Sequence, residues 1–420
     1  MNGSSLRRQL PHGLTDLFFE QAAAKVALER ILEHIFESWG YRRIILPTFE
    51  YYDSLSTGAS TDLQEEMYRF FDREGKTLAL RPDMTVPTAR VVGTKLYDQP
   101  LPLRFFYIGN VFRYEEPQAG RRREFTQAGI ELLGSGTPEA DAEVLSVAIA
   151  ALKALGIHRF RTNLGQVAFL KAILKEANLS NGELSQLEQA IGHKNDTEVD
   201  HTLKKLRLTE EISHAVRAIP HLCGGIEVLE EAKKLSQNPA ALQALDHLAQ
   251  VYALLEAEGV AEHVIIDLGE VRSMAYYTGI TFHAYVEGLG FHVCRGGRYD
   301  GLVGNFGRDM PAVGFALGVE RAMLITKPQI RLAPDIIMKA CRHPACHALA
   351  AKARSLGLSV EIEVLGRQGE ELIAYGQAKG ATRILACDEN SPTNYLLTDA
   401  RGSRWLSRQQ LEEEMASWTS

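Results

Sequence analysis

The sequence predicts an α+β protein: a large domain of mixed strands and helices, followed by a smaller α/β domain. Its 420 residues suit two or three domains at roughly 100 to 200 residues each. A strand-loop-strand pattern at 103–134 indicates a sheet, and strand-like and helix-like stretches alternate beyond residue 330. We therefore place the large domain at 1–325, with a helical insertion at about 165–258, and the smaller domain at 330–420.

The N-terminal part combines one strong helix pattern with short strand patterns. Apolar residues recur at helical spacing over residues 21–39. The next stretch, YRRIILPTFEYY, is rich in β-branched and aromatic residues, but Pro47 restricts it to an edge or a bulge. RFFDREGKTLALRP predicts a hairpin that turns at Gly75. Pro87 then falls in the first turn of a helix for which Thr85 is the candidate cap.

The return strand of the strand-loop-strand pattern carries polar residues on one face. Two-residue alternation puts the following side chains together: Phe125, Gln127, Gly129 and Glu131. An amide and a carboxylate that flank a glycine make a plausible pocket floor. A helix opens at Thr137 and Pro138 and ends before Gly156.

The second half of the large domain begins with the helical insertion and then returns to strands. Residues 165–258 are rich in Leu, Ala, Lys and Glu at helical spacing. In AVGFALGVERAMLI, Gly314 and Gly318 lie four residues apart, as expected where another backbone packs closely. Residues 330–334 predict a linker to the smaller domain.

Composition narrows the classes of function. The net charge is 46 − 53 = −7 and the pI is near 6.0, so the chain has no overall basic field for nucleic acid or an anionic membrane. Five cysteines without a C-x-x-C pair fit a reducing compartment. The N-terminus lacks the apolar segment of an export signal, and no apolar run is long enough to span a membrane. We expect a cytoplasmic protein.

Several polar residues interrupt otherwise apolar or glycine-rich segments. They are Asp83, Thr85, Arg113, Gln127, Glu131, Arg272, Tyr277, Arg298 and Arg321. Taken singly, each has a structural explanation: Arg113 could pair with Glu131, and Tyr276 with Tyr277 could be core aromatics. Together they predict convergence on a ligand that carries both charges, because buried polar groups are costly without partners. An amino acid is such a ligand: its ammonium pairs with carboxylates and its carboxylate with arginine.

No metal or cofactor is expected. The segment CRHPACH brings Cys341, His343, Cys346 and His347 together in sequence, but structural zinc sites usually pair two such clusters and no second one is visible. The chain also lacks a Walker-type loop, a G-x-G-x-x-G segment that opens a helix, and a G-x-S-x-G elbow.

The ordered motifs resemble those of class II aminoacyl-tRNA synthetases, and within them the histidyl branch. YRRIILPTFEYY resembles the first class motif, which builds a dimer interface. FRYEEPQAGRRREFTQAGIELLG resembles the second and GFALGVERAML the third, while VRSMAYYTGITF and GGRYDGL resemble histidine-specific stretches. The resemblance implies an antiparallel sheet flanked by helices, with nucleotide contacts at Arg113 and Arg321. Around the histidine it implies Asp83, Thr85, Gln127, Glu131, Arg272, Tyr276 and Tyr277.

Departures from the synthetase pattern fall at these sites. The chain has RPDMT at 81–85 where active synthetases have R-P-E-G-T, and RSMAYY at 272–277 where they have R-G-L-D-Y-Y. Glu116 stands where the second motif has an arginine, so a triphosphate should bind poorly. From residue 330 onward, the chain has 11 Lys and Arg and 11 Asp and Glu, so its charge is balanced. This balance makes nucleic acid an unlikely partner.

A closer resemblance is to the regulatory subunits of ATP phosphoribosyltransferase, a family related to histidyl-tRNA synthetases. LQEEMYRFFDREGKTLALRPDMTVPTAR and LPHGLTDL carry it. It implies a non-catalytic dimer that assembles with the short catalytic subunit, supports its activity and helps confer inhibition by L-histidine in the first step of histidine biosynthesis. The alternative is a functional histidyl-tRNA synthetase.

Overall fold

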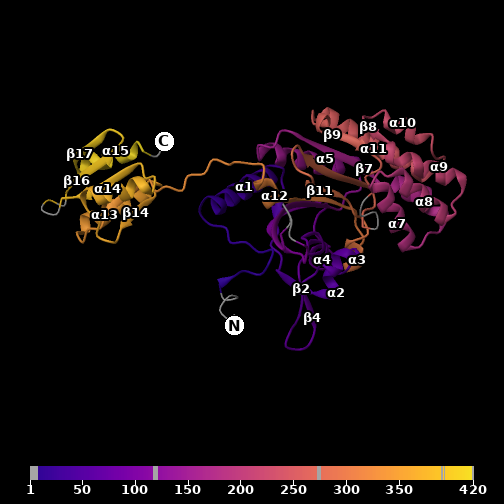
Figure 1. Cartoon of the computed structure of the whole chain (residues 1–420), viewed down its shortest axis with the longest axis horizontal. Helices are drawn as coiled ribbons and strands as arrows, with labels where there is room; N and C mark the ends of the chain where they lie inside the picture. The colour runs from indigo at the N-terminus through magenta and orange to yellow at the C-terminus, as the bar shows by residue number, and fades with distance from the viewer. Residues whose placement is uncertain (1–7, 117–121, 272–275, 389–390, 392, 419–420) are drawn as a thin grey trace. The chain divides into compact units, whose positions relative to one another are not determined.

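The computed structural model describes residues 8–116, 122–271, 276–388, 391 and 393–418 (Figure 1). The chain divides into two compact units, Met1–Pro328 and Gln329–Ser420. Within the described residues, no helix combines the length and the apolar composition that crossing a membrane requires.

A nine-stranded sheet forms the centre of the first unit. Its strand order is β1-β5-β6-β12-β11-β10-β7-β9-β8. The strands are β1 (Arg42–Arg43), β5 (Leu103–Phe112), β6 (Glu124–Leu133), β7 (Phe160–Gln166), β8 (Cys223–Gly224), β9 (Val264–Asp267), β10 (Ile280–Val286), β11 (His292–Arg298) and β12 (Ala312–Gly318). From β5 to β7 all neighbours are antiparallel, as predicted, but β1 joins β5 and β9 joins β7 in parallel. The sheet is therefore mixed at its flanks, since these strands are reached through longer connections.

Helices α1 (Phe19–Ser38), α5 (Pro138–Ala154) and α12 (Val319–Met323) cover one face of this sheet. Leu28, Leu32 and Phe36 follow one another at four-residue spacing on α1 and are all buried. From β6, Ala128, Ile130 and Leu132 join the same core. Because side chains alternate along a strand, Gln127, Gly129 and Glu131 point to the opposite face.

A small subdomain lies near that opposite face. It is formed by the part of the chain between β1 and β5. A second sheet has the order β2-β4-β3, with β2 at Phe49–Tyr51, β3 at Arg69–Phe71 and β4 at Thr77–Leu80. The predicted hairpin is confirmed, with Gly75 at a φ of 82° in its turn. Helices α2 (Tyr52–Leu55), α3 (Thr61–Glu65) and α4 (Thr85–Lys95) complete it.

Thr85 does not cap α4, contrary to the sequence prediction. The residue before the helix is Met84, and Thr85 is the first helical residue. The Asp83 carboxylate instead accepts a hydrogen bond from the Val86 N–H at 3.2 Å. An aspartate two residues before the helix thus supplies the acceptor for the first turn.

The insertion is helical from residue 167 onward, since residues 165 and 166 still belong to β7. Its helices are α6 (Val167–Leu174), α7 (Asn181–Gly192), α8 (Asp196–Leu206), α9 (Glu210–Ala218), α10 (Val228–Lys233) and α11 (Pro239–Ala257). The insertion also contains strand β8, which pairs with β9 at the edge of the large sheet. The 3₁₀ turns with defined bounds include η2 (Lys175–Ala177), η3 (Ile219–His221), η4 (Ala261–His263) and η5 (Val303–Phe306).

The second unit has its own sheet and core. The strand order is β14-β13-β15-β16-β17, with β13, β14 and β15 parallel and the last two pairs antiparallel. Its strands are β13 (Ile336–Lys339), β14 (Val360–Glu363), β15 (Arg383–Cys387), β16 (Asn394–Asp399) and β17 (Gly402–Ser407). Its helices are α13 (Pro344–Ser355), α14 (Gly369–Ala378) and α15 (Arg408–Ala416). Strands and helices alternate as predicted up to β15, after which a hairpin follows.

Candidate functional site

Glu131 is the centre of the candidate site. It lies on β6 with only 1% of its surface exposed. The Tyr107 hydroxyl donates to its Oε1 at 3.2 Å, and the Tyr299 hydroxyl donates to its Oε2. Gly314 faces it on β12, and a Cβ there would lie 1.9 Å from Oε2. The close approach of another backbone predicted at Gly314 is confirmed, because the same Cβ would lie 2.5 Å from the Ile130 carbonyl oxygen. At Gly318 the prediction is wrong, since the nearest atoms belong to the Arg321 side chain, at 3.3 Å.

Burial raises the pKa of Glu131 to about 8. Hydrogen bonds from the hydroxyls of Tyr299, Thr85 and Tyr107 act against this rise, and the negative charge of Asp83 adds to it. The carboxyl therefore holds a proton at neutral pH in the unliganded protein. A cation such as an ammonium group would release that proton, since an opposite charge nearby favours the carboxylate.

Three tyrosines form an aromatic wall beside Glu131. The ring of Tyr276 stacks on Tyr299 with 5.5 Å between centroids, and meets Tyr277 edge-on at 5.0 Å. Burial raises the pKa of Tyr277 to about 12, and it raises those of Tyr276 and Tyr299 well above the usual value for tyrosine. These hydroxyls stay protonated and can donate hydrogen bonds, while the rings offer flat apolar surface.

Arg113 and Gln127 carry polar atoms that nothing in the described chain satisfies. The Nε of Arg113 donates to the Pro82 carbonyl at 2.9 Å, but its buried Nη2 has no partner. The Oε1 of the buried Gln127 also lacks one. Such groups are costly unless a ligand pairs with them.

A second arginine strengthens the positive end of the site. Burial lowers the pKa of Arg113 to about 10, and the charge of Arg295 lowers it further. Arg295 lies on β11, between His283 of β10 and Ala316 of β12, and its side chain makes no hydrogen bond or ion pair within the described residues. Glu115 lies 3.7 Å from Arg113 Nη1 and offsets part of the charge. The site thus offers a carboxylate for a cation and guanidinium groups for an anion.

The remaining predicted residues differ in their placement. Asp83 and Thr85 lie close enough to Glu131 to shift its pKa. Arg321 donates from Nη1 to the His292 carbonyl at 2.8 Å and lies 5.2 Å from the Phe291 ring. Arg272 falls outside the described residues. The suggested pairing of Arg113 with Glu131 is wrong, because Arg113 contacts Pro82 and Glu115 instead.

Arg298 is a structural residue, contrary to its inclusion among the ligand-binding candidates. Its guanidinium donates to the fully buried Asp141 at 2.6 and 3.0 Å, and Nη1 also contacts Asp300 and the Ser135 carbonyl. Asp141 bonds His247 of the insertion at 2.7 Å as well. This network joins β11, α5 and α11, so the arginine is already neutralised.

Sequence reasoning missed Tyr107, Tyr299 and Arg295. Tyr299 directly follows the glycine-rich segment that contains Arg298, and Arg295 lies in the same strand. Both residues could have been found by the criterion used for the other candidates, which is a polar group among glycines and apolar residues. Tyr107 had no such signal, since an aromatic residue is ordinary in a strand.

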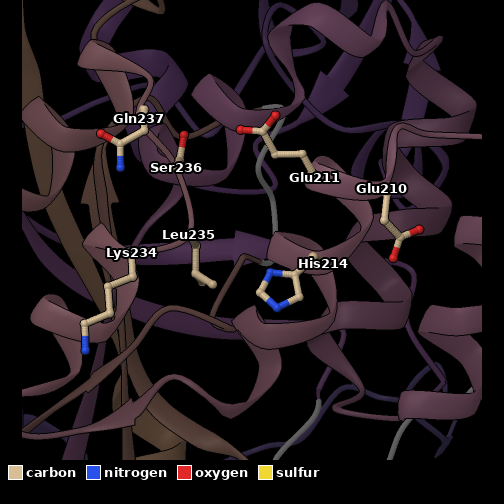
Figure 2. Close-up of a pocket in the computed structure, with 7 residues that line it drawn as sticks. All are labelled: Glu210, Glu211, His214, Lys234, Leu235, Ser236 and Gln237. Carbon is tan, nitrogen blue, oxygen red and sulfur yellow. The ribbon is translucent and has the colours of Figure 1, made fainter.

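A separate open hollow of about 300 Å³ lies in the helical insertion (Figure 2). It is lined by Glu210, Glu211, His214, Lys234, Leu235, Ser236 and Gln237. Most of these side chains are exposed, and charges of both signs are mixed among them. It shares no residue with the site around Glu131.

Comparisons with known proteins agree with this architecture. The family model for histidyl-tRNA synthetase matches residues 13–322. The ATP phosphoribosyltransferase regulatory subunit of Thermoanaerobacter sp. is 42% identical over 333 residues, covering 79% of this chain and 86% of the relative. That of Moorella thermoacetica is 41% identical over 380 residues, covering 90% of this chain and 97% of the relative.

Solved structures show the same fold. A crystal structure described as an ATP phosphoribosyltransferase regulatory subunit/histidyl-tRNA synthetase from Bacillus halodurans matches with a TM-score of 0.80 and 30% identity, covering 90% of this chain and 98% of the other. Histidyl-tRNA synthetase from Nostoc sp. PCC 7120 matches with a TM-score of 0.79 and 21% identity, covering 98% and 99%. The chain therefore belongs to the family of ATP phosphoribosyltransferase regulatory subunits, which has the class II fold of histidyl-tRNA synthetases.

Proposed function

We propose that this chain is a non-catalytic subunit that assembles with the short catalytic subunit of ATP phosphoribosyltransferase. In that assembly it supports phosphoribosyl transfer to ATP and confers inhibition by L-histidine in the first step of histidine biosynthesis. The observation that carries the proposal is the 41% identity over 380 residues to a regulatory subunit, of which 97% is covered.

The polar groups around β6 support histidine as the ligand. The Glu131 and Asp83 carboxyls suit its ammonium group, and the unpaired Oε1 of Gln127 can accept from the ammonium or from a ring N–H. The resemblance adds Arg272 to this set. The stacked tyrosines supply a flat apolar surface for the imidazole.

Loss of synthetase chemistry is part of the proposal. Glu116 stands where the second motif has an arginine, and Glu115 lies 3.7 Å from the Arg113 guanidinium that would meet a phosphate. A carboxylate about 5 Å from a phosphate charge contributes roughly 3 kcal/mol of repulsion at an effective dielectric near 20. Arg321 is held by the His292 carbonyl and the Phe291 ring.

Inhibition requires that histidine bind one state of the assembly more tightly than another. A tenfold preference supplies about 1.4 kcal/mol per site. Self-association would multiply this effect over the sites of the assembly.

An exposed apolar surface around the first class motif supports a dimer: Ile45 is 87% exposed, and Phe49, Tyr51 and Phe71 are at least half exposed.

Co-expression with a short catalytic subunit tests the main proposal. We expect the two chains to co-purify, and formation of phosphoribosyl-ATP to require both and to fall on addition of histidine. Separately, the purified chain is assayed for histidine-dependent exchange of pyrophosphate into ATP. Exchange at an ordinary enzymatic rate would support the alternative, a functional histidyl-tRNA synthetase, and refute the regulatory role.

A thermal-shift experiment tests the histidine pocket. We expect histidine to raise the melting temperature of the wild type, and Glu131→Ala or Arg272→Ala to abolish that rise. Glu139→Ala is the matched control, because Glu139 is a fully exposed carboxylate at the start of α5. An unchanged rise in both pocket variants would mean that histidine binds elsewhere.

A further inference from the structure

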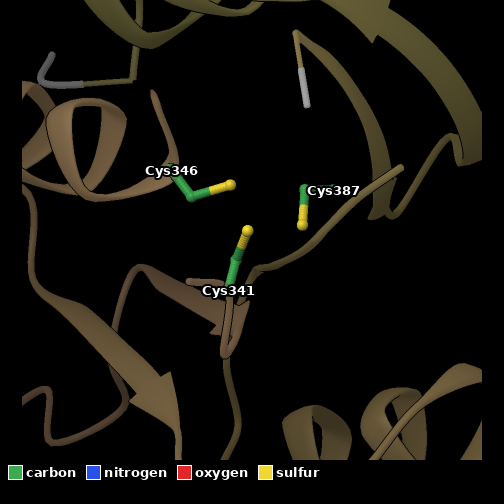
Figure 3. Close-up of side chains that lie close together, drawn as sticks. All are labelled: Cys341, Cys346 and Cys387. Atoms are coloured by element: carbon green, nitrogen blue, oxygen red, sulfur yellow. The ribbon is translucent and has the colours of Figure 1, made fainter. Parts of the chain in front are cut away.

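Three cysteines converge in the second unit, although they are spread over 47 residues of sequence (Figure 3). Cys341 follows β13, Cys346 lies in the first turn of α13, and Cys387 ends β15. Their sulfur atoms all lie within 4.8 Å of one another, and Figure 3 shows the three side chains pointing toward a common centre. Cys346 and Cys387 are buried, whereas Cys341 is partly exposed.

The spacing of the sulfur atoms is close to that of a metal–thiolate site. A zinc–sulfur bond is about 2.3 Å, which sets the sulfur–sulfur distance at roughly 4 Å for three ligands around one ion. The widest pair therefore needs to close by less than about 1 Å. Among the described residues, no histidine or carboxylate belongs to this group, so the ligand set is purely thiolate. Such a set selects soft ions.

The position in the fold is one where ligands bind. Strands β13 and β15 are parallel neighbours, and the chain visits β14 on the other side of β13 between them. Cys387, the last residue of β15, and Cys341, two residues beyond β13, thus lie at the carboxyl ends of neighbouring strands at a point where the strand order reverses. Cys346 adds the N-terminal turn of the twelve-residue helix α13, whose dipole favours negative charge.

A positive charge and a buried hydroxyl lie beside the three cysteines. Lys339 ends β13, two residues before Cys341, and its charge acts on both Cys341 and Cys387. Three thiolates and a divalent ion carry a net charge of −1, which a neighbouring ammonium offsets. The hydroxyl of the fully buried Tyr395 lies beside Cys346.

We propose that Cys341, Cys346 and Cys387 bind one thiophilic d¹⁰ ion, Zn²⁺ or Cu⁺, and so fasten β13, α13 and β15 together. On binding, each thiol loses its proton to solvent and forms one metal–sulfur bond, with no change of oxidation state. Zinc takes its fourth ligand from solvent on the partly exposed side of Cys341. The site does not depend on the proposed regulatory function.

The test uses the full-length chain, reduced and stripped of metal with a chelator. Zinc is titrated in competition with a chromophoric chelator, and Cu⁺ is titrated anaerobically in the same way. We expect one ion per chain with at least one of the two metals, and sulfur-to-metal charge-transfer absorption after substitution with Co²⁺ if the site takes zinc. We also expect the metal to raise the unfolding temperature of the second unit.

Cys341→Ser is the decisive variant, because its partly exposed position allows the fold to persist, as circular dichroism can verify. It should weaken binding by more than the 10- to 100-fold that loss of a supporting group costs. Cys223→Ser, in the first unit and exposed, is the matched control and should bind as the wild type does. Absence of stoichiometric zinc and Cu⁺, or equal affinity in Cys341→Ser, overturns the proposal. Disulfide formation within the trio without metal uptake after reduction overturns it as well.

Discussion

Replacing Glu131 with glutamine should change how the stability of the first unit depends on pH. The folded protein keeps the proton of Glu131 up to a pKa of about 8, whereas the unfolded chain releases it near 4.5. Between these values the unfolded state binds fewer protons than the folded state. Stability is therefore lost as pH rises through this window. Glutamine resembles the protonated acid in shape and cannot titrate.

The size of the effect follows from linkage. A group that is protonated only in the folded state changes the free energy of unfolding by about 1.4 kcal/mol per pH unit. The side chain is almost fully buried, so solvent does not screen it. Between pH 5.5 and 6.5, well inside the window, the wild type should lose about 1.4 kcal/mol relative to Glu131→Gln.

Urea unfolding followed by tryptophan fluorescence measures this difference. Of the three tryptophans, Trp39 lies in the first unit, and Trp405 and Trp418 lie in the second. In a W405F, W418F background, Trp39 alone reports on the first unit. All other titrating groups are shared, so their contributions cancel in the comparison.

Parallel stability curves for wild type and Glu131→Gln between pH 5.5 and 6.5 would refute the reasoning. They would mean that the carboxyl is already ionised in the unliganded protein. The pocket would then not couple ligand binding to proton release.

Three further predictions follow from contacts elsewhere in the first unit. Asp141→Ala should lower its stability by about 3–5 kcal/mol in urea unfolding, because it leaves a buried guanidinium without its partner; a loss below about 1 kcal/mol would contradict the structural role. Ile45→Glu should convert a dimer to a monomer in light scattering after size-exclusion chromatography, whereas Val364→Glu, 78% exposed in the second unit, should not; equal masses would exclude this surface. Gly314→Ala should abolish the histidine-induced thermal shift by displacing the buried carboxylate, whereas Gly301→Ala, which has open space around its Cα, should preserve it; a retained shift in both would show that the pocket tolerates the methyl group.

Local patterns predicted the elements of the first unit well. The helix expected at 21–39 is Phe19–Ser38, and the strand-loop-strand pattern is β5 and β6. The class II fold implied by the motifs is confirmed by the solved structures. These features depend on residue spacing over short stretches, which helices and hairpins reflect directly. The parallel pairing of β1 with β5 and of β9 with β7 was missed, because strand direction is set by long connections.

Side-chain partners were harder to predict than elements. Arg298 interrupts a glycine-rich segment in the same way as the ligand-binding candidates do. Its charge is nevertheless neutralised by Asp141, 157 residues earlier in the sequence. Tyr299 bonds Glu131 across 168 residues. The roles of Asp83, Thr85, Gln127 and Arg272 toward histidine remain predictions for the thermal-shift experiment.

Residue spacing was enough to identify the family, the order of helices and strands, and the polar face of β6, since each depends on nearby residues. The folded arrangement was needed to show which of those polar groups are already paired and which are left for a ligand. It also decided that Cys387 joins Cys341 and Cys346, whereas the sequence displayed a single cluster. The physical reason is that hydrogen bonds and thiolate sites require distances of a few ångströms, and strand order and crossovers alone bring distant residues that close.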